Sequence, residues 1–324
     1  MDGTQQQNGP GHDWGGYVAI EPPPPPGVFE VGLVLAGAVS AGAYTAGVID
    51  FLIEALDAWE AAKRECARVN PDPLTWKTPG HRVRLRIFSG ASAGSMTSAI
   101  AAVALKYTFP HVQATPNDAN PFYKAWVRDI DISKLTLTED LKNSQTPVVS
   151  LLDSTPLVGI LQGALDYVGR PAPPRPYLDP SVRFIFTQGN LRGIPYFLSL
   201  TSNAPAGLGM TAHADYQGFS LRYSVGVPGS TPTSSRADDI AVTFPNNHED
   251  PNWTSLGTAA LASGAFPIGL APRQIKRSGA GFDYRFVVVP GTGATPAQVV
   301  QLRPRWQIST APIPSVLSSW TGGR

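Results

Sequence analysis

The chain of 324 residues is poor in several residue types that would identify common classes of protein. It holds one cysteine, Cys66, which excludes an intrachain disulfide and a cysteine-rich zinc cluster. We expect Cys66 to pack against its neighbours in a reducing compartment. The chain also has no large excess of positive or negative charge, because 25 basic and 24 acidic residues give a net charge of +1. This balance, without a groove motif of basic and aromatic residues, gives no indication of nucleic-acid binding.

Long apolar runs are missing as well. No stretch reaches the roughly 18 apolar residues that a membrane span requires, and Met1 is not followed by a basic and then an apolar segment. We therefore expect a cytoplasmic protein, or one peripheral to a membrane, with neither a signal peptide nor a transmembrane segment. A hydrophobic content of 42% is enough for a substantial core, which favours a single α/β domain.

The most informative segment that is present covers residues 90–94, Gly-Ala-Ser-Ala-Gly. It follows a strand-like run at residues 83–88 and opens a helix of small residues at 95–105. A strand, a tight turn and a helix form the setting of a nucleophile elbow, in which the flanking glycines Gly90 and Gly94 permit a strained backbone. We predict that Ser92 is the nucleophile, with the N-terminus of the following helix facing the developing negative charge.

A second strand, turn and helix precede this segment. Residues 31–37 form an unbroken apolar run that predicts a buried parallel strand, and a turn rich in glycine and alanine follows at residues 37–42. Helical spacing from Tyr44 towards Arg64 predicts a helix. Its expected buried side comprises Val48, Leu52, Ala55, Leu56 and Trp59, and its expected polar side Asp57, Glu60, Lys63 and Arg64.

This first turn does not fit a nucleotide site. A P-loop needs Lys and then Ser or Thr after its last glycine, whereas Gly42 is followed by Ala43 and Tyr44. The dinucleotide fingerprint fails too, because its second glycine would fall at Val39. The two units instead predict the two halves of an acyl-transfer site, in which one turn supplies backbone N–H donors and the other supplies the serine.

At this point the chain resembles a known family, the patatin-like phospholipases. Residues 33–48 are similar to the family's oxyanion segment, and residues 150–157 look like its helix start after a variable region. Residues 262–267, Ala-Ser-Gly-Ala-Phe-Pro, are similar to its Ala-Ser-x-Ala-x-Pro helix end. Together with the elbow, these landmarks extend from residue 31 to about residue 272. The resemblance implies a mixed α/β sheet sandwiched between helices.

The resemblance also implies a reaction. Ser92 would attack a fatty-acyl ester of a lipid, backbone N–H groups of Gly37, Ala38 and Val39 would form the oxyanion hole, and no metal or organic cofactor would take part. The family usually has three glycines and then Arg or Lys here, but this chain has Ala38, Val39 and Ala41. The lost cation makes neutral esters, reached at a membrane or micelle surface, better expected substrates than phospholipids.

The family's catalytic aspartate, in an Asp-Gly-Gly or Asp-Gly-Ala sequence, is not found. The only Asp-Gly pair is Asp2-Gly3, and Asp283 is the sole carboxylate beyond Pro267. We interpret Asp283 as a solvated turn residue paired with Arg285, although it stays the remaining candidate for the base. The alternative hypothesis is therefore a catalytically silent domain that binds lipid or a protein partner.

The α/β-hydrolase order of Ser, acid and His is a further alternative. Three histidines follow Ser92, namely His111, His213 and His248, and each is expected in a loop. Only one clear strand and helix precede the elbow, whereas this layout generally has several strands first. The order is thus disfavoured.

We divide the chain into three parts: a disordered arm rich in Pro and Gly at residues 1–29, a patatin-like domain at 30–290 and an irregular tail at 291–324. We expect the chain to be a fragment or an early-terminated product whose aspartate strand lies past Arg324. Within the domain the patterns predict the following elements: helices at 122–130 and 253–266, a helical stripe of Leu157, Leu161, Leu165 and Val168, a strand at 182–187 with 196–201 as its hairpin partner, and a strand at 220–227.

Overall fold

The structure is a computed structural model that describes residues 26–38, 42–112, 117–138, 141–142, 149–198, 208–223, 239–278, 282, 285–291, 296–302, 304 and 320–323. Nearly all of the predicted arm, at residues 1–25, and most of the predicted tail lie outside the described residues. In the described part of the chain, the search for a helix both long and apolar enough to cross a membrane finds none.

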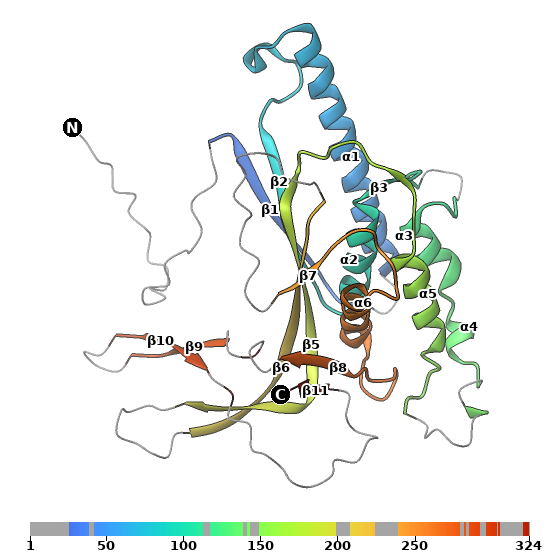
Figure 1. Ribbon diagram of the computed structural model, residues 1–324, viewed down its shortest axis with the longest axis vertical. Helices are drawn as coiled ribbons and strands as arrows, with labels where there is room; N and C mark the ends of the chain where they lie inside the picture. The colour runs from blue at the N-terminus through green and yellow to red at the C-terminus, as the bar shows by residue number, and fades with distance from the viewer. Residues whose placement is uncertain are drawn as a thin grey trace.

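A five-stranded sheet forms the centre, with the strands in the order β1-β2-β5-β6-β7 (Figure 1). Its strands are β1 Val28–Leu35, β2 Arg82–Gly90, β5 Leu178–Leu198, β6 Leu208–Leu221 and β7 Ile240–Val242. Strands β1, β2 and β5 are mutually parallel, β6 runs antiparallel to β5, and β7 is parallel to β6. The sheet is mixed, which confirms the predicted mixed α/β class.

Helices pack on this sheet, and in Figure 1 the larger ones lie to the same side of it. They are α1 Gly42–Val69, α2 Ala93–Ala104, α3 Pro121–Tyr123, α4 Ile132–Leu135, α5 Thr155–Leu165 and α6 Pro251–Gly264, with a 3-10 turn at Pro73–Thr75 and a π-helix, η2, at Lys124–Asp129. Helix α2 is central, because it contacts α1, α5 and α6 as well as the sheet. Its alanines at 99, 101, 102 and 104 are fully buried, and these small side chains permit that close approach.

Three small sheets complete the described structure. They pair β3 Tyr107–Thr108 with β4 Arg170–Pro171, β8 Ile275–Ser278 with β11 Trp320–Gly323, and β9 Arg285–Val289 with β10 Gln298–Leu302. Aromatic pairs join the central strands, since the rings of Phe88 and Phe184 stack at 5.1 Å and those of Phe186 and Phe219 lie 5.6 Å apart. These contacts join β2, β5 and β6 near the end of β2, where the turn of Ser92 begins.

The predicted buried side of α1 is partly wrong. Val48 is 48% exposed and Ala55 is exposed, whereas Glu60 and Lys63, assigned to the polar side, are buried. Burial is tolerated because the two charges form an ion pair and Lys63 Nζ also donates to the carbonyl of His81 at 3.2 Å. Apolar periodicity alone could not predict the hydrogen bond from Lys63 to His81, which lies beyond the helix.

The predicted hairpin at residues 182–201 is also wrong. Tyr196 continues β5, and the antiparallel partner of the whole strand is β6. A bulge between Gly189 and Ile194 shifts the register, and Gly193 adopts a positive φ of 74° there. Glycine is compatible with a β-bulge as well as with a hairpin turn, so the sequence pattern predicted a turn where the structure has a bulge.

The remaining predictions agree better with the structure. The stripe on α5 is confirmed for Leu157, Leu161 and Leu165, but the helix ends at Leu165 and Val168 is 73% exposed. Cys66 is half-buried, with its thiol 3.7 Å from the Thr78 hydroxyl. The predicted strand at 220–227 is the end of β6, and residues 224–227 lie outside the described residues.

Candidate active site

Ser92 lies in a strained turn between β2 and α2. Its backbone has φ 53° and ψ −120°, and the first residue of α2 follows it directly. A residue with a side chain in such a conformation costs on the order of 1–3 kcal/mol, and such costs are concentrated at functional sites. Ser92 is half-buried, so its hydroxyl is neither lost in the core nor free on the surface.

The glycines on either side of Ser92 are required by close backbone contacts. A Cβ on Gly90 would lie 2.5 Å from the Ser95 nitrogen, and a Cβ on Gly94 would lie 2.1 Å from the Leu35 carbonyl oxygen. Real Cβ atoms do not approach backbone atoms so closely. The turn therefore packs directly against the end of β1, with no space for a side chain between them.

The two predicted turns meet at this point. Leu35 pairs with Gly90, and the Ala91 nitrogen donates to the Leu35 oxygen at 3.1 Å. A Cβ on Gly37 would lie 3.1 Å from the Ser92 Cβ. Gly37 is thus next to the serine, while Val39 lies outside the described residues.

A second serine holds the turn from the opposite side. The Ser92 nitrogen donates to Ser263 Oγ at 2.8 Å, and the Ser95 hydroxyl donates to the same oxygen at 2.8 Å. Ser263 lies on the last turn of α6, 171 residues further along the chain. The motif at residues 262–267 contained Ser263, but its contact with Ser92 was missed because no local pattern specifies a partner so distant.

Among the residues that the structure describes, none is placed as a general base for Ser92. Among the described residues, no carboxylate or histidine forms a hydrogen bond with the Ser92 hydroxyl. The candidate Asp283 lies outside the described residues. Its neighbour Phe282 is buried, and the Phe282 carbonyl accepts a hydrogen bond from the Tyr196 hydroxyl at 3.3 Å, on the part of β5 beyond the bulge.

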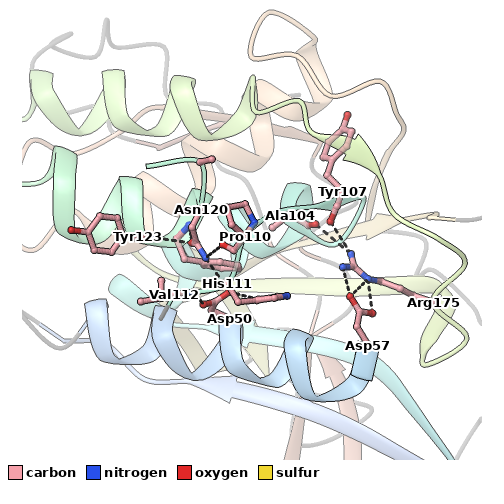
Figure 2. Close-up of polar contacts among 12 residues, drawn as sticks. Asp50, Asp57, Ala104, Tyr107, Pro110, His111, Val112, Asn120, Tyr123 and Arg175 are labelled. Atoms are coloured by element: carbon pink, nitrogen blue, oxygen red, sulfur yellow. Dashed lines mark hydrogen bonds and ion pairs between the residues drawn. The ribbon is translucent and has the colours of Figure 1, made fainter. Parts of the chain in front are cut away.

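The three histidines that follow Ser92 are held by other groups. His111 Nδ1 lies 2.8 Å from Asp50 Oδ1, His213 Nδ1 lies 2.7 Å from the Asn190 carbonyl, and His248 Nδ1 lies against the Asp166 carboxylate. Figure 2 shows His111 against Asp50 on α1. Within the described residues, the structure therefore does not assemble the Ser, acid and His order of an α/β-hydrolase.

Asp50 is the centre of a buried polar cluster (Figure 2). Besides His111, it accepts hydrogen bonds from the Val112 nitrogen at 2.9 Å and from Asn120 Nδ2 at 3.1 Å. Asn120 also caps the following helix, because its Oδ1 accepts from the nitrogens of Phe122 and Tyr123. The cluster fixes the start of α3, and hence of the π-helix that continues it, against α1.

The other end of α2 is held by Arg175 (Figure 2). Its guanidinium donates to the carbonyls of Leu105 at 2.7 Å and Tyr107 at 3.2 Å, and it forms an ion pair with Asp57 at 2.7 Å. Asp57 also accepts from the Tyr177 hydroxyl at 2.8 Å, and burial raises the pKa of Tyr177 well above its ordinary value. Carbonyls at this end of the helix are therefore capped by a buried cation.

A mixed α/β sheet with a serine in a strained turn between strand and helix is the architecture of several serine hydrolases. In a comparison with known families, the model of the patatin-like phospholipases matches residues 33–286, so the chain belongs to this family. The chain is 37% identical over 273 residues to uncharacterized protein y4iI of Sinorhizobium fredii, covering 76% of this chain and 37% of that protein. The chain thus spans little more than a third of the relative's length. No solved structure matches.

Proposed function

We propose that the protein is a serine acyl hydrolase that cleaves fatty-acyl esters of lipids, with its catalytic domain within residues 30–290. The observation that carries the proposal is the strained backbone of Ser92, held between Gly37 on one side and Ser263 on the other. Strain of this kind is retained where the surrounding structure enforces it, most often at functional sites. Membership of the patatin-like family supports an acyl-transfer chemistry.

In the proposed reaction, Ser92 Oγ attacks the ester carbonyl carbon and its proton passes to a general base that is not assigned. The carbonyl oxygen takes up negative charge, and N–H groups of the turn at Gly37, Ala38 and Val39 stabilise it. The ester C–O bond then breaks and the alcohol leaves with the proton. Water cleaves the acyl-serine in turn, releasing a carboxylic acid and restoring the hydroxyl.

Ser263 has a positioning role in this proposal. Because the Ser92 nitrogen already donates to Ser263 Oγ, that N–H is not available to the oxyanion. The donors left for the oxyanion are those of the Gly37 turn and of the start of α2. The hydrogen bond also holds the Ser92 backbone in its strained conformation.

An apolar surface beside the site supports contact with aggregated lipid. Leu151, Phe266 and Ile268 are 80%, 62% and 74% exposed, and the Leu151 nitrogen donates to the Ile268 carbonyl at 2.8 Å. These residues lie next to the end of α6, which carries Ser263. We expect this surface to contact a membrane or micelle. Replacing Ile268 by Asp should weaken sedimentation with lipid vesicles, whereas Leu74→Asp, at an exposed site in the 3-10 turn, should not.

One observation favours a second candidate function. Because no described carboxylate reaches the Ser92 hydroxyl, a catalytically silent domain that binds lipid or a protein partner would have the same described structure. Without a base, the serine hydroxyl is a weak nucleophile. The two functions differ in whether the folded protein turns over an ester.

Hydrolysis of p-nitrophenyl butyrate by the full chain decides between them. We expect Ser92→Ala to lower kcat/KM by at least about 10³-fold, because removing a nucleophile abolishes the covalent route. Ser255→Ala, at the other end of α6, is the matched control and should retain the wild-type rate. Equal rates for wild type and Ser92→Ala would overturn the assignment of the nucleophile. No turnover by folded wild-type protein on any ester would favour the silent domain.

A further inference from the structure

A cleft of about 490 Å³ lies at the end of α2 that is remote from Ser92. Residues that follow α2 line it, together with the start of β2, the start of β5, the residue after β6 and the segment at residues 171–176. Helix α2 has 12 residues, so about 18 Å of helix separates the cleft from the serine. The volume lies within the range of about 300–1,000 Å³ that is usual for small-molecule sites.

Most of the lining is apolar and rigid. Leu105 and Leu178 contribute side chains, and residues 171–176, Pro-Ala-Pro-Pro-Arg-Pro, contribute proline rings. Proline has no N–H group and a fixed φ, so this proline wall offers apolar contact and has little freedom to lose on binding. The Ala172 N–H already donates to the Lys106 carbonyl at 3.0 Å. The wall therefore suits the apolar body of a ligand.

Arg175 holds the proline wall in place (Figure 2). Its guanidinium is occupied by the Asp57 carboxylate and by the carbonyls of Leu105 and Tyr107. The Arg175 carbonyl in turn accepts from the Leu178 nitrogen at 3.0 Å. These contacts join the wall to the end of α2 and to the start of β5. The cleft is thus formed before any ligand enters it.

Lys106 lines the cleft and retains donors for a ligand. Its Nζ donates to the Tyr223 carbonyl at 3.1 Å and lies 5.2 Å from the centre of the Phe244 ring. An ammonium group has three N–H donors, so two are left. Within the part of the chain that the structure describes, no carboxylate forms an ion pair with Lys106.

Arg84 brings a second cation to the cleft. Its side chain is 32% exposed, and its ion pair with Glu30 is a single contact of 3.4 Å. Asp179, the acid of the lining, is 1% exposed and has its Oδ2 atom 3.6 Å from Nε of Arg86, which is not a lining residue. Arg84, Lys106 and Arg175 together outnumber this one acid, so the lining carries excess positive charge.

We propose that this cleft binds an amphipathic carboxylate, with the carboxylate on Lys106 and Arg84 and the apolar body along the proline wall. Charge-assisted hydrogen bonds from ammonium and guanidinium groups to a carboxylate are among the strongest in proteins. A neutral ester lacks the charge and a small inorganic anion lacks the apolar body, so neither uses both parts of the lining. The site is separate from Ser92, because no residue of the candidate active site lines the cleft.

Calorimetry on the full chain, with decanoate kept below its micellar concentration, tests the proposal. We expect 1-decanol to bind at least about tenfold more weakly than decanoate, because it makes no charge-assisted hydrogen bond. Hexanoate should also bind at least about tenfold more weakly, because it buries four fewer methylene groups.

Three substitutions locate the bound decanoate. Lys106→Met and Arg84→Met keep an unbranched side chain and remove the charge, so each should weaken decanoate binding at least about tenfold and leave 1-decanol binding unchanged. Ala172→Trp fills the cleft and should abolish binding of both. Lys77→Met, at an exposed position in the loop before β2, is the matched control and should change neither affinity.

Unchanged decanoate affinity in folded Lys106→Met and Arg84→Met proteins would overturn the proposal. So would equal affinities for decanoate and 1-decanol, binding that survives Ala172→Trp, or no decanoate binding by folded wild-type protein. None of these results bears on ester hydrolysis at Ser92, which p-nitrophenyl butyrate measures separately. Failure of the proposed function and failure of this inference are therefore distinguishable.

Discussion

The two ends of α2 differ in how their backbone is held. At the N-terminal end, Ser92 is strained, half-buried and enclosed by glycines that allow no side chain. At the C-terminal end, the carbonyl of Leu105, the residue that follows the helix, accepts a hydrogen bond from Arg175, which is itself paired with Asp57. The N-terminal end keeps Ser92 in an unfavourable backbone conformation. At the C-terminal end, by contrast, Arg175 satisfies carbonyl groups that would otherwise lack a donor. Under the proposed function, the first end serves the chemistry and the second the stability of the fold.

The ends can be tested separately. Helix α2 has 12 residues, so they lie about 18 Å apart. Substitutions at that separation with no shared partner have nearly additive effects. Changes at the Arg175 end should therefore alter the free energy of unfolding and leave activity per folded molecule intact. Changes around Ser92 should act mainly on activity.

The largest effect is expected for Arg175→Ala. It leaves the carbonyls of Leu105 and Tyr107 without this donor and the Asp57 carboxylate with the Tyr177 hydroxyl alone among its described donors. Because the Asp57 side chain is 29% exposed, the cost should lie near the lower end of the range of about 3–5 kcal/mol that applies to fully buried pairs. Urea unfolding measures the loss. The exposed pair of Arg68 and Glu65 supplies the control, since Arg68→Ala should not change the unfolding midpoint measurably. If Arg175→Ala lowered activity more than it lowered the fraction of folded protein, the Arg175 end would not act on stability alone.

At the opposite end, Gly37→Ala should lower kcat/KM by more than about 10-fold and less than about 100-fold, the effect of a 1 Å displacement at a reacting group. The new methyl group would lie 3.1 Å from the Ser92 Cβ, a contact that displaces the serine by a few tenths of an ångström. Gly159→Ala is the control, because nothing lies within 4 Å of its Cβ position on α5. That change should raise the free energy of unfolding by about 0.5–1 kcal/mol. Unaltered kinetics in the Gly37→Ala protein would show that the turn at Gly37 takes no part in ester hydrolysis.

Ser263→Ala should have a smaller effect on the same site. It removes the acceptor of the Ser92 N–H, which costs about 1–3 kcal/mol when the donor stays buried. We expect kcat to fall about tenfold, with KM nearly unchanged, because the residue positions the nucleophile without touching substrate. Steady-state kinetics with p-nitrophenyl esters gives both constants. A change in KM alone would mean that Ser263 contributes to substrate binding instead.

The smallest effect concerns alkaline pH and the Arg175 end. Burial raises the pKa of Tyr223, whose hydroxyl donates to the Ala102 carbonyl on α2 at 2.8 Å. The folded protein keeps this proton above pH 10 while the unfolded chain loses it, so the free energy of unfolding falls as pH rises past 10. The slope from one such group is about 1.4 kcal/mol per pH unit. Urea unfolding between pH 9 and 11 should show a shallower decline in Tyr223→Phe, and equal slopes would contradict this.

The comparison also shows what the sequence could predict. Local rules identified the turn of Ser92 and the strands and helices around it, because apolar runs and flanking glycines constrain the backbone directly. The contact of Ser263 with Ser92 was not predictable, since it joins residues 171 positions apart. Burial of Glu60 and Lys63 was missed because both were assigned to the polar side, although they pair with each other on α1 and Lys63 also donates to the His81 carbonyl outside the helix. The bulge in β5 was missed because glycine permits both a bulge and a turn.

For the candidate site, the sequence predicted which two turns lie together but not which residue is the base. Proximity of Gly37 to Ser92 followed from two successive strand and helix units whose strands are parallel neighbours. A base was sought through the Asp-Gly sequence of the family, and local pattern offers no other way to recognise a carboxylate that reaches Ser92.

The central claim is that the Ser92 hydroxyl is an activated nucleophile. Labelling the folded full chain with a fluorophosphonate and locating the adduct by peptide mass spectrometry tests it most directly. We predict a single adduct on Ser92, which Ser92→Ala abolishes and Ser255→Ala retains. An adduct on another residue, or no adduct on Ser92 in folded protein, would contradict the account.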